Sequence, residues 1–160
     1  MERTLLYFAY GSNLDVEQME KRCPGVVMVG TAVLPRHRLA FTGYSRGWNG
    51  ALATVVPAND GAVEGLLYQI PVRSMPPLDL YEGHPMLYCR VRRKVVDATS
   101  VPRFAYVYIM PLVGPELPPG TPYLLVLRRA YERFGFNVNA LPDFQRGPTA
   151  KRSKILRIRQ

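Results

Sequence analysis

The chain has 160 residues and a formal charge of +9, with 48% apolar and 21% charged residues. This length fits one domain, and the apolar content excludes a chain that is disordered by composition. Thirteen glycines and fifteen prolines favour short strands joined by tight turns over a bundle of long helices.

The first predicted structure is a buried strand over residues 5–10, where apolar and aromatic residues follow one another without a charge. It runs into Gly11-Ser12-Asn13, a composition typical of a tight loop. Asp15 is then expected to cap a short helix, which Pro24-Gly25 would end.

Four strands are predicted in the next part of the chain. β-branched and apolar residues favour two of them over residues 26–34 and 38–44. Residues 51–56 and 62–70 are predicted as the two arms of a hairpin, because the segment 57–61 between them contains Asn-Asp-Gly, a strong turn signal.

The later part of the chain is predicted to begin with a short helix over residues 74–81, capped by Ser74. An antiparallel hairpin of residues 88–96 and 103–110 follows, and then a one-sided helix over residues 122–134. Hairpins with one long packed helix indicate an α+β fold, built on a small mixed or antiparallel β-barrel with surrounding helices.

One domain is expected over residues 1–145, followed by a basic tail over residues 146–160. The tail has six basic residues and no acidic one. It could attract nucleic acid or an anionic membrane surface, or it could be a solvated end that only keeps the protein soluble. The basic run at residues 90–94 also has two interpretations: it could face an anionic ligand or RNA, or it could be a solvated outer face.

Metal binding and membrane insertion are not expected. Cys23 and Cys89 form no CxxC pair and no ligand cluster with His37 or His84, so neither a zinc site nor a disulfide framework is predicted. The apolar run that ends at Tyr10 is too short for a signal peptide, and prolines interrupt the later apolar stretch. These patterns are typical of a cytoplasmic protein.

The first candidate functional segment is the loop that begins at Tyr10. Gly11 would let a ligand approach the backbone closely, and free backbone N–H groups near a helix start favour a carboxylate or a developing oxyanion. An ordinary strand–turn–helix connection, with Ser12 or Asn13 as a local cap, would have the same sequence.

The second candidate is Glu82, which follows Leu80 and Tyr81 at the end of a predicted helix and precedes a glycine. It has no obvious cationic partner at i,i+4, so burial would favour its protonated form, as a general acid/base requires. A solvated glutamate at a turn is the alternative. His84 could share a proton with Glu82 or could lie exposed.

Four segments stand in an order found in a known family: YFAYGSNL at residues 7–14, VEGLLYQI at 63–70, LDLYEG at 78–83 with Tyr88 soon after, and PGTPY at 119–123. In this combination the chain resembles the γ-glutamylcyclotransferase-like (AIG2-like) superfamily, over roughly residues 5–135. It departs from the family at Gly120, where a serine is common, which affects a loop contact but not Glu82.

The resemblance implies a barrel of about five strands with a pocket floored by the loop after the first strand. By similarity, Glu82 is the acid/base, and Tyr88 and Tyr123 contact the substrate. The resemblance also implies that a γ-glutamyl group is cradled by five consecutive residues: Tyr10, Gly11, Ser12, Asn13 and Leu14.

The implied reaction cyclises a γ-glutamyl amine or γ-glutamyl amino acid to 5-oxoproline and releases the free amine. The α-amine of the substrate is the nucleophile, so no protein nucleophile, metal or cofactor is expected. The loops at residues 43–50 and 111–122 are expected to contact the leaving amine. The alternative is a protein of the same fold that binds a metabolite or a partner without catalysis.

Overall fold

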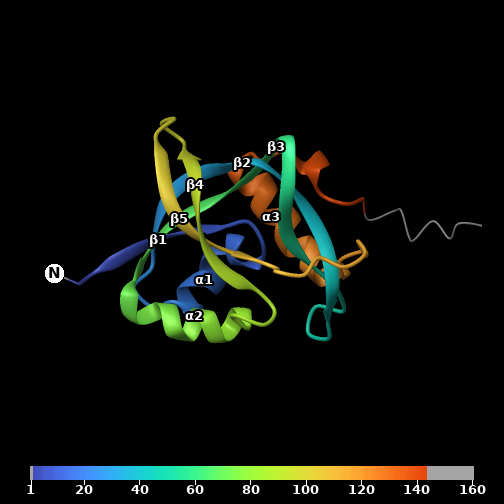
Figure 1. Ribbon diagram of the computed structural model, residues 1–160, viewed down its shortest axis with the longest axis horizontal. Helices are drawn as coiled ribbons and strands as arrows, with labels where there is room; N and C mark the ends of the chain where they lie inside the picture. Colours follow the sequence, from blue (N-terminus) through green and yellow to red (C-terminus); the bar gives the residue numbers. More distant parts are fainter. Residues whose placement is uncertain (1, 144–160) are drawn as a thin grey trace, which may run out of the picture.

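Five strands close into a barrel in the order β1-β3-β2-β4-β5 in the computed structural model, which describes residues 2–143 (Figure 1). Neighbouring strands pair antiparallel, except β1 and β5, which pair in parallel and close the barrel. The strands are β1 (Thr4–Ala9), β2 (Val27–Ser45), β3 (Gly50–Pro71), β4 (Cys89–Asp97) and β5 (Pro102–Ile109). The predicted α+β class with a small mixed barrel is therefore confirmed.

Strands β2 and β3 are each much longer than predicted. Residues 27–34 and 38–44 belong to one strand, and so do residues 51–56 and 62–70. The predicted hairpin turn at residues 57–61 is therefore wrong. Both halves of β3 pair with β2, and the register jumps from Pro35↔Ala62 to His37↔Pro57. The Asn-Asp-Gly segment thus forms a bulge, because pairing with a common partner outweighs its local turn preference.

The chain reverses instead between β2 and β3, where Ser45 pairs with Gly50. Residues 46–49 form the turn, and Asn49 has a φ of 52°. The predicted β4–β5 hairpin is confirmed, with a register that runs from Cys89↔Ile109 to Val96↔Pro102.

Three α-helices surround the barrel: α1 (Val16–Arg22), α2 (Met75–Glu82) and α3 (Thr121–Phe134). The Asp15 side chain accepts a hydrogen bond from the Gln18 backbone N–H at 3.1 Å, so the predicted cap of α1 is confirmed. Ser74 precedes α2 but makes no capping bond with its side chain, contrary to prediction. Helices α2 and α3 end at Gly83 and Gly135, which have left-handed φ values of 66° and 71°.

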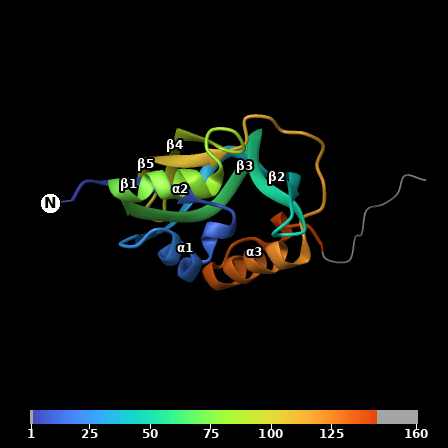
Figure 2. The ribbon, with the colours of Figure 1, turned by 90° about the horizontal axis from the view of Figure 1, so that it is seen from below.

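Helix α2 crosses the lower end of the barrel in Figure 1, and the view from below in Figure 2 places it in front of the strands. Helices α1 and α3 lie along another side of the barrel in Figure 2. Their buried residues Met19, Leu127 and Tyr131 join the barrel residues Phe8 and Tyr68 in one apolar core. Met75 and Leu78 of α2 belong to the same core, which holds α2 against the barrel.

The predicted domain boundary at residue 145 and the basic tail over residues 146–160 lie outside the described residues. Of the basic run at residues 90–94, Arg92, Arg93 and Lys94 are exposed and Arg90 is half-buried. Within residues 2–143, no helix combines the length and apolar character that crossing a bilayer would need.

Candidate active site

The loop after β1 is a short 3-10 turn (Ser12–Leu14) anchored to the barrel. The backbone carbonyls of Gly11 and Ser12 accept hydrogen bonds from the amides of Leu14 and Asp15, at 3.0 and 3.1 Å. The preceding amides therefore have no partner inside the turn. The Tyr68 hydroxyl donates to the Asn13 carbonyl at 2.9 Å and fixes the loop against β3.

Asn13 connects this loop to Glu82. Its buried side-chain amide nitrogen donates to Glu82 Oε1 at 2.9 Å and to the Tyr7 hydroxyl at 2.8 Å. The Arg22 guanidinium donates to Asn13 Oδ1 and, at 3.1 Å, to Ser12 Oγ. Both ends of the Asn13 amide are thus held, and its orientation toward Glu82 is set.

Glu82 is the last residue of α2 and is half-buried. Burial raises the pKa of its carboxyl to about 7, although Arg22 and the hydrogen bond from Asn13 both act to lower it. A carboxyl with a pKa near neutrality can both accept and release a proton, which is the property of a general acid/base.

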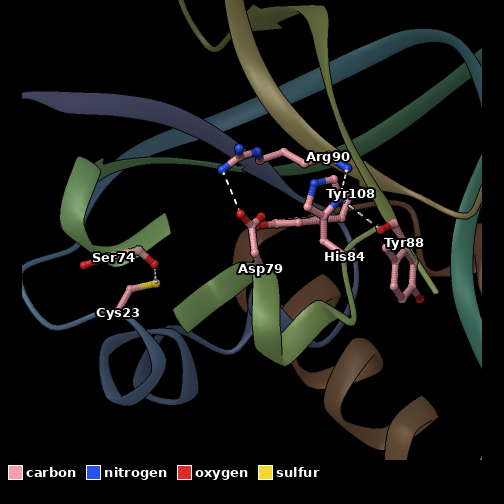
Figure 3. Close-up of polar contacts among 7 residues, drawn as sticks. All are labelled: Cys23, Ser74, Asp79, His84, Tyr88, Arg90 and Tyr108. Atoms are coloured by element: carbon pink, nitrogen blue, oxygen red, sulfur yellow. Dashed lines mark hydrogen bonds and ion pairs between the residues drawn. The ribbon is translucent and has the colours of Figure 1, made fainter. Parts of the chain in front are cut away.

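Asp79 holds α2 against the barrel (Figure 3). One carboxylate oxygen accepts from the Tyr108 hydroxyl at 2.7 Å, and the other lies 3.1 Å from the Arg90 guanidinium. The Tyr108 carbonyl in turn accepts from the Tyr10 hydroxyl at 2.6 Å. Helix α2 is therefore fixed to β4, to β5 and to the first loop, and its position determines where Glu82 lies.

His84 lies among the backbone groups of β4 and the segment before it (Figure 3). Its Nδ1 accepts from the Arg90 amide at 3.1 Å and lies 3.3 Å from the Tyr88 carbonyl oxygen. It is half-buried, and the proton relay with Glu82 gains no support from these contacts.

A cavity of about 260 Å³ opens beside Glu82. Of the residues predicted from the sequence, those that line it are Tyr10, Gly11, Ser12, Asn13, Glu82, Tyr88 and Tyr123. Leu14 is not brought to the cavity, because its side chain is 1% exposed and packs in the apolar core. Among the described lining residues, Glu82 is the only charged one.

Ser45 and Trp48 line the cavity from residues 43–50, a segment that was expected to form part of the pocket wall. Sequence reasoning missed the other lining residues: Tyr7, Leu52, Ala53, Tyr81, Leu87 and Tyr108. The Trp48 ring packs on Tyr123, with ring centroids 5.2 Å apart. The only tryptophan in a glycine-rich loop was the available signal for this wall. Arg22, which orients Asn13, had no such signal, because nothing in its local sequence distinguishes it from an ordinary surface arginine.

Tyr88 and Tyr123 both bind the backbone of Ala53. The Tyr88 hydroxyl donates to the Ala53 carbonyl at 2.6 Å, and the Tyr123 hydroxyl accepts from the Ala53 amide at 3.2 Å. The Tyr123 hydroxyl donates to no acceptor among the described residues, so its proton can be donated to a ligand. Burial raises the pKa of both phenols and keeps them neutral.

Gly11 lies where the space next to the backbone is narrow. Its φ is −111° and its ψ is −138°. A Cβ at this position would lie 3.0 Å from the Tyr123 hydroxyl oxygen, so a side chain would crowd the space between this loop and Tyr123 of α3.

Residues 2–143 contain no group of three or more His, Cys, Asp or Glu side chains suited to a metal ion.

Residues 7–124 match the sequence profile of the family described as "Gamma-glutamyl cyclotransferase, AIG2-like". A gamma-glutamylcyclotransferase of Mus musculus is 34% identical over 84 residues, which are 50% of this chain and 45% of that protein. The Homo sapiens protein of the same name is 34% identical over 87 residues, 51% of this chain and 46% of its own. The match thus spans about half the length of these relatives.

Solved structures show the same fold. One described as "Gamma-glutamyl cyclotransferase" has a TM-score of 0.81 and 24% identity, and the alignment covers 93% of this chain and 95% of that one. A yeast gamma-glutamyl cyclotransferase described as specific to glutathione has a TM-score of 0.63 and 14% identity, with 85% and 90% covered. At these identities the likeness concerns the fold alone.

Proposed function

Since the chain belongs to the gamma-glutamyl cyclotransferase, AIG2-like family, we propose that it cyclises a γ-glutamyl amine or γ-glutamyl amino acid to 5-oxoproline. The cavity beside Glu82 would hold the γ-glutamyl group, and the free amine would leave. The single observation that carries this proposal is the contact between two distant segments: Glu82 Oε1 accepts from Asn13 of the first loop at 2.9 Å.

The reaction needs one proton carrier. Glu82 takes a proton from the α-ammonium of the substrate, and the resulting amine attacks the γ-glutamyl carbonyl carbon to form the C–N bond of a five-membered ring. The bond from that carbon to the leaving nitrogen then breaks as Glu82 returns its proton to this nitrogen. The ring nitrogen loses its second proton to the departing amine, which leaves as an ammonium ion. The pKa of about 7 at Glu82 suits both steps near neutral pH.

The reaction also needs donors toward the carbonyl oxygen, where negative charge develops. The amides of Ser12 and Asn13 have no partner inside their 3-10 turn, and the Tyr123 hydroxyl can donate a proton on the same side of the cavity. Neutral donors of this kind stabilise an oxyanion without adding a cation, and no cation is found among the described lining residues.

The direct experiment is to incubate the purified protein with a panel of γ-glutamyl amines and amino acids and to measure 5-oxoproline. Heat-denatured protein measures spontaneous cyclisation. Formation of 5-oxoproline above this background supports the proposal. A native protein that binds γ-glutamyl compounds in calorimetry but forms no 5-oxoproline would favour the non-catalytic alternative.

The acid limb of kcat/KM against pH is expected to have an apparent pKa of about 7, and not the 4.5 of an ordinary glutamate. Below this value the base form of Glu82 declines about tenfold for each pH unit, and activity declines with it. Rates measured from pH 4 to 8, with buffers of constant ionic strength, test this. An acid limb near 4.5 would exclude Glu82 as the base.

The same shift predicts how stability depends on pH. The folded protein binds the Glu82 proton more tightly than the unfolded chain. As the pH rises from about 4.5 to 7, the contribution of Glu82 to the free energy of unfolding should therefore decrease, and above pH 7 it should stay constant. In a Glu82→Gln variant, where residue 82 cannot titrate, this part of the pH dependence of the free energy of unfolding should be missing.

A further inference from the structure

A second cavity of about 290 Å³ adjoins the first one. Its walls are the C-terminal part of β2, the turn after α2 and the loop that follows β5. Leu87 lines both cavities, and Glu82 lies five positions before it at the end of α2. The two cavities are therefore neighbours that share the Leu87 side chain.

The second cavity is apolar. None of the described residues that line it carries a charge, and its only polar side chain is Thr42. The Thr42 hydroxyl donates to the Pro115 carbonyl at 2.9 Å, so its proton is already used. A charged or strongly polar group placed here would lose water without gaining a partner.

Apolar side chains at the rim are exposed to water. Met86 and Leu112 are each 87% exposed, and they face the cavity from the turn after α2 and from the loop after β5. Burial of such surface by an apolar ligand is favourable, roughly in proportion to the area covered. The cavity therefore favours an apolar occupant.

The walls of this cavity are held in place by backbone hydrogen bonds. The Leu117 amide donates to the Phe41 carbonyl at 2.8 Å, which fixes the far end of the proline-rich loop to β2. The Leu87 amide donates to the Gly83 carbonyl at 2.9 Å, which closes the turn after α2. An occupant thus meets a shaped site and does not have to order it, and this reduces the entropic cost of binding.

We propose that the second cavity receives the leaving amine, and that this amine carries an apolar side chain. The inference rests on the proposed cyclotransferase function and adds the chemical class of its leaving group. The catalytic cavity would hold the γ-glutamyl part, whereas Leu87, Met86 and Leu112 would contact the side chain of the departing amino acid or amine.

The test compares γ-glutamyl-leucine with γ-glutamyl-asparagine, which has a side chain of nearly the same shape but polar. Both substrates carry the same α-carboxylate, so the ratio of their kcat/KM values measures the effect of the side chain of the leaving amino acid alone. We expect γ-glutamyl-leucine to be favoured by about tenfold or more, since a buried site without partners discriminates against a polar isostere. γ-Glutamyl-aspartate should be poorer still.

A matched pair of variants assigns the preference to this cavity. Leu112→Asn makes the exposed rim polar and should reduce the leucine-to-asparagine ratio several-fold. Leu80→Asn makes the same change at an 83% exposed leucine of α2 that lines neither cavity, and the ratio should stay as in the parent. Melting temperatures confirm that both variants are folded.

Equal kcat/KM values for the two substrates would overturn this inference while the proposed function stands. A preference that Leu112→Asn leaves unchanged would also overturn it, because the selectivity would then arise elsewhere. A dimer in solution that Leu112→Asn dissociates, without a change in the ratio, would assign the cavity to a second copy of the chain and overturn it too. Failure to form 5-oxoproline from any substrate would remove the proposed function and this inference together.

Discussion

Replacement of Glu82 by glutamine is expected to lower turnover by about 10²–10⁴-fold and to leave the fold intact. Glutamine keeps the size of the side chain and an oxygen that can accept the 2.9 Å hydrogen bond from Asn13. It cannot take a proton from the substrate, so only the chemical step is removed. The measurement is the rate of 5-oxoproline formation at saturating substrate, together with the melting temperature.

The control for this variant is Glu20→Gln, which removes the same charge from an exposed position on α1. Its turnover should equal that of the parent, because Glu20 does not line the catalytic cavity. Near-normal turnover by Glu82→Gln, with the control unchanged, would remove Glu82 from the mechanism.

Gly65→Ala is expected to lower the melting temperature by about 3–10 °C, the equivalent of about 1–3 kcal/mol of overpacking in a protein of this size. A Cβ at residue 65 would lie 2.3 Å from the Ala9 carbonyl oxygen and 2.6 Å from the Phe8 ring. Strand β1 cannot move away, because it pairs with β3 from Thr4 to Ala9. Thermal unfolding followed by circular dichroism measures the effect.

The effect should extend to activity, since Ala9 leads directly into Tyr10 and Gly11 of the catalytic loop. Gly47→Ala is the matched control: the nearest atom to its added Cβ is Ser45 Oγ at 3.8 Å, an ordinary contact. If Gly65→Ala has the same melting temperature as the parent and the control, then β1 and β3 do not approach each other as closely here as described.

Local patterns in the sequence were sufficient for several short-range features, although the Ser74 cap of α2 was wrong. The Asp15 cap, the stop of α3 at Gly135 and the β4–β5 hairpin all depend on residues near one another in the chain. Capping groups and left-handed glycines act over a few residues, so their effect is visible without the fold.

The same kind of signal failed at the Asn-Asp-Gly segment of β3. There the local sequence favours a turn, but the register jump opposite His37 makes it a bulge within one strand. A Cβ at Gly61 would lie 2.3 Å from the His37 carbonyl oxygen, so this glycine permits a close approach between strands and not a reversal. Strand pairing over long distances decides such cases, because it supplies many hydrogen bonds and much buried surface at once.

The sequence by itself determined the fold class and the two segments proposed for the site, since each has a recognisable motif. Only the tertiary structure decided how the segments meet: Asn13 and Glu82 are separated by 69 positions and joined by one hydrogen bond. It also placed Leu14 in the core and Arg22 behind Asn13. The pKa of Glu82 belongs to the fold for the same reason, because its main cause is burial, which the packing of α2 against the barrel creates.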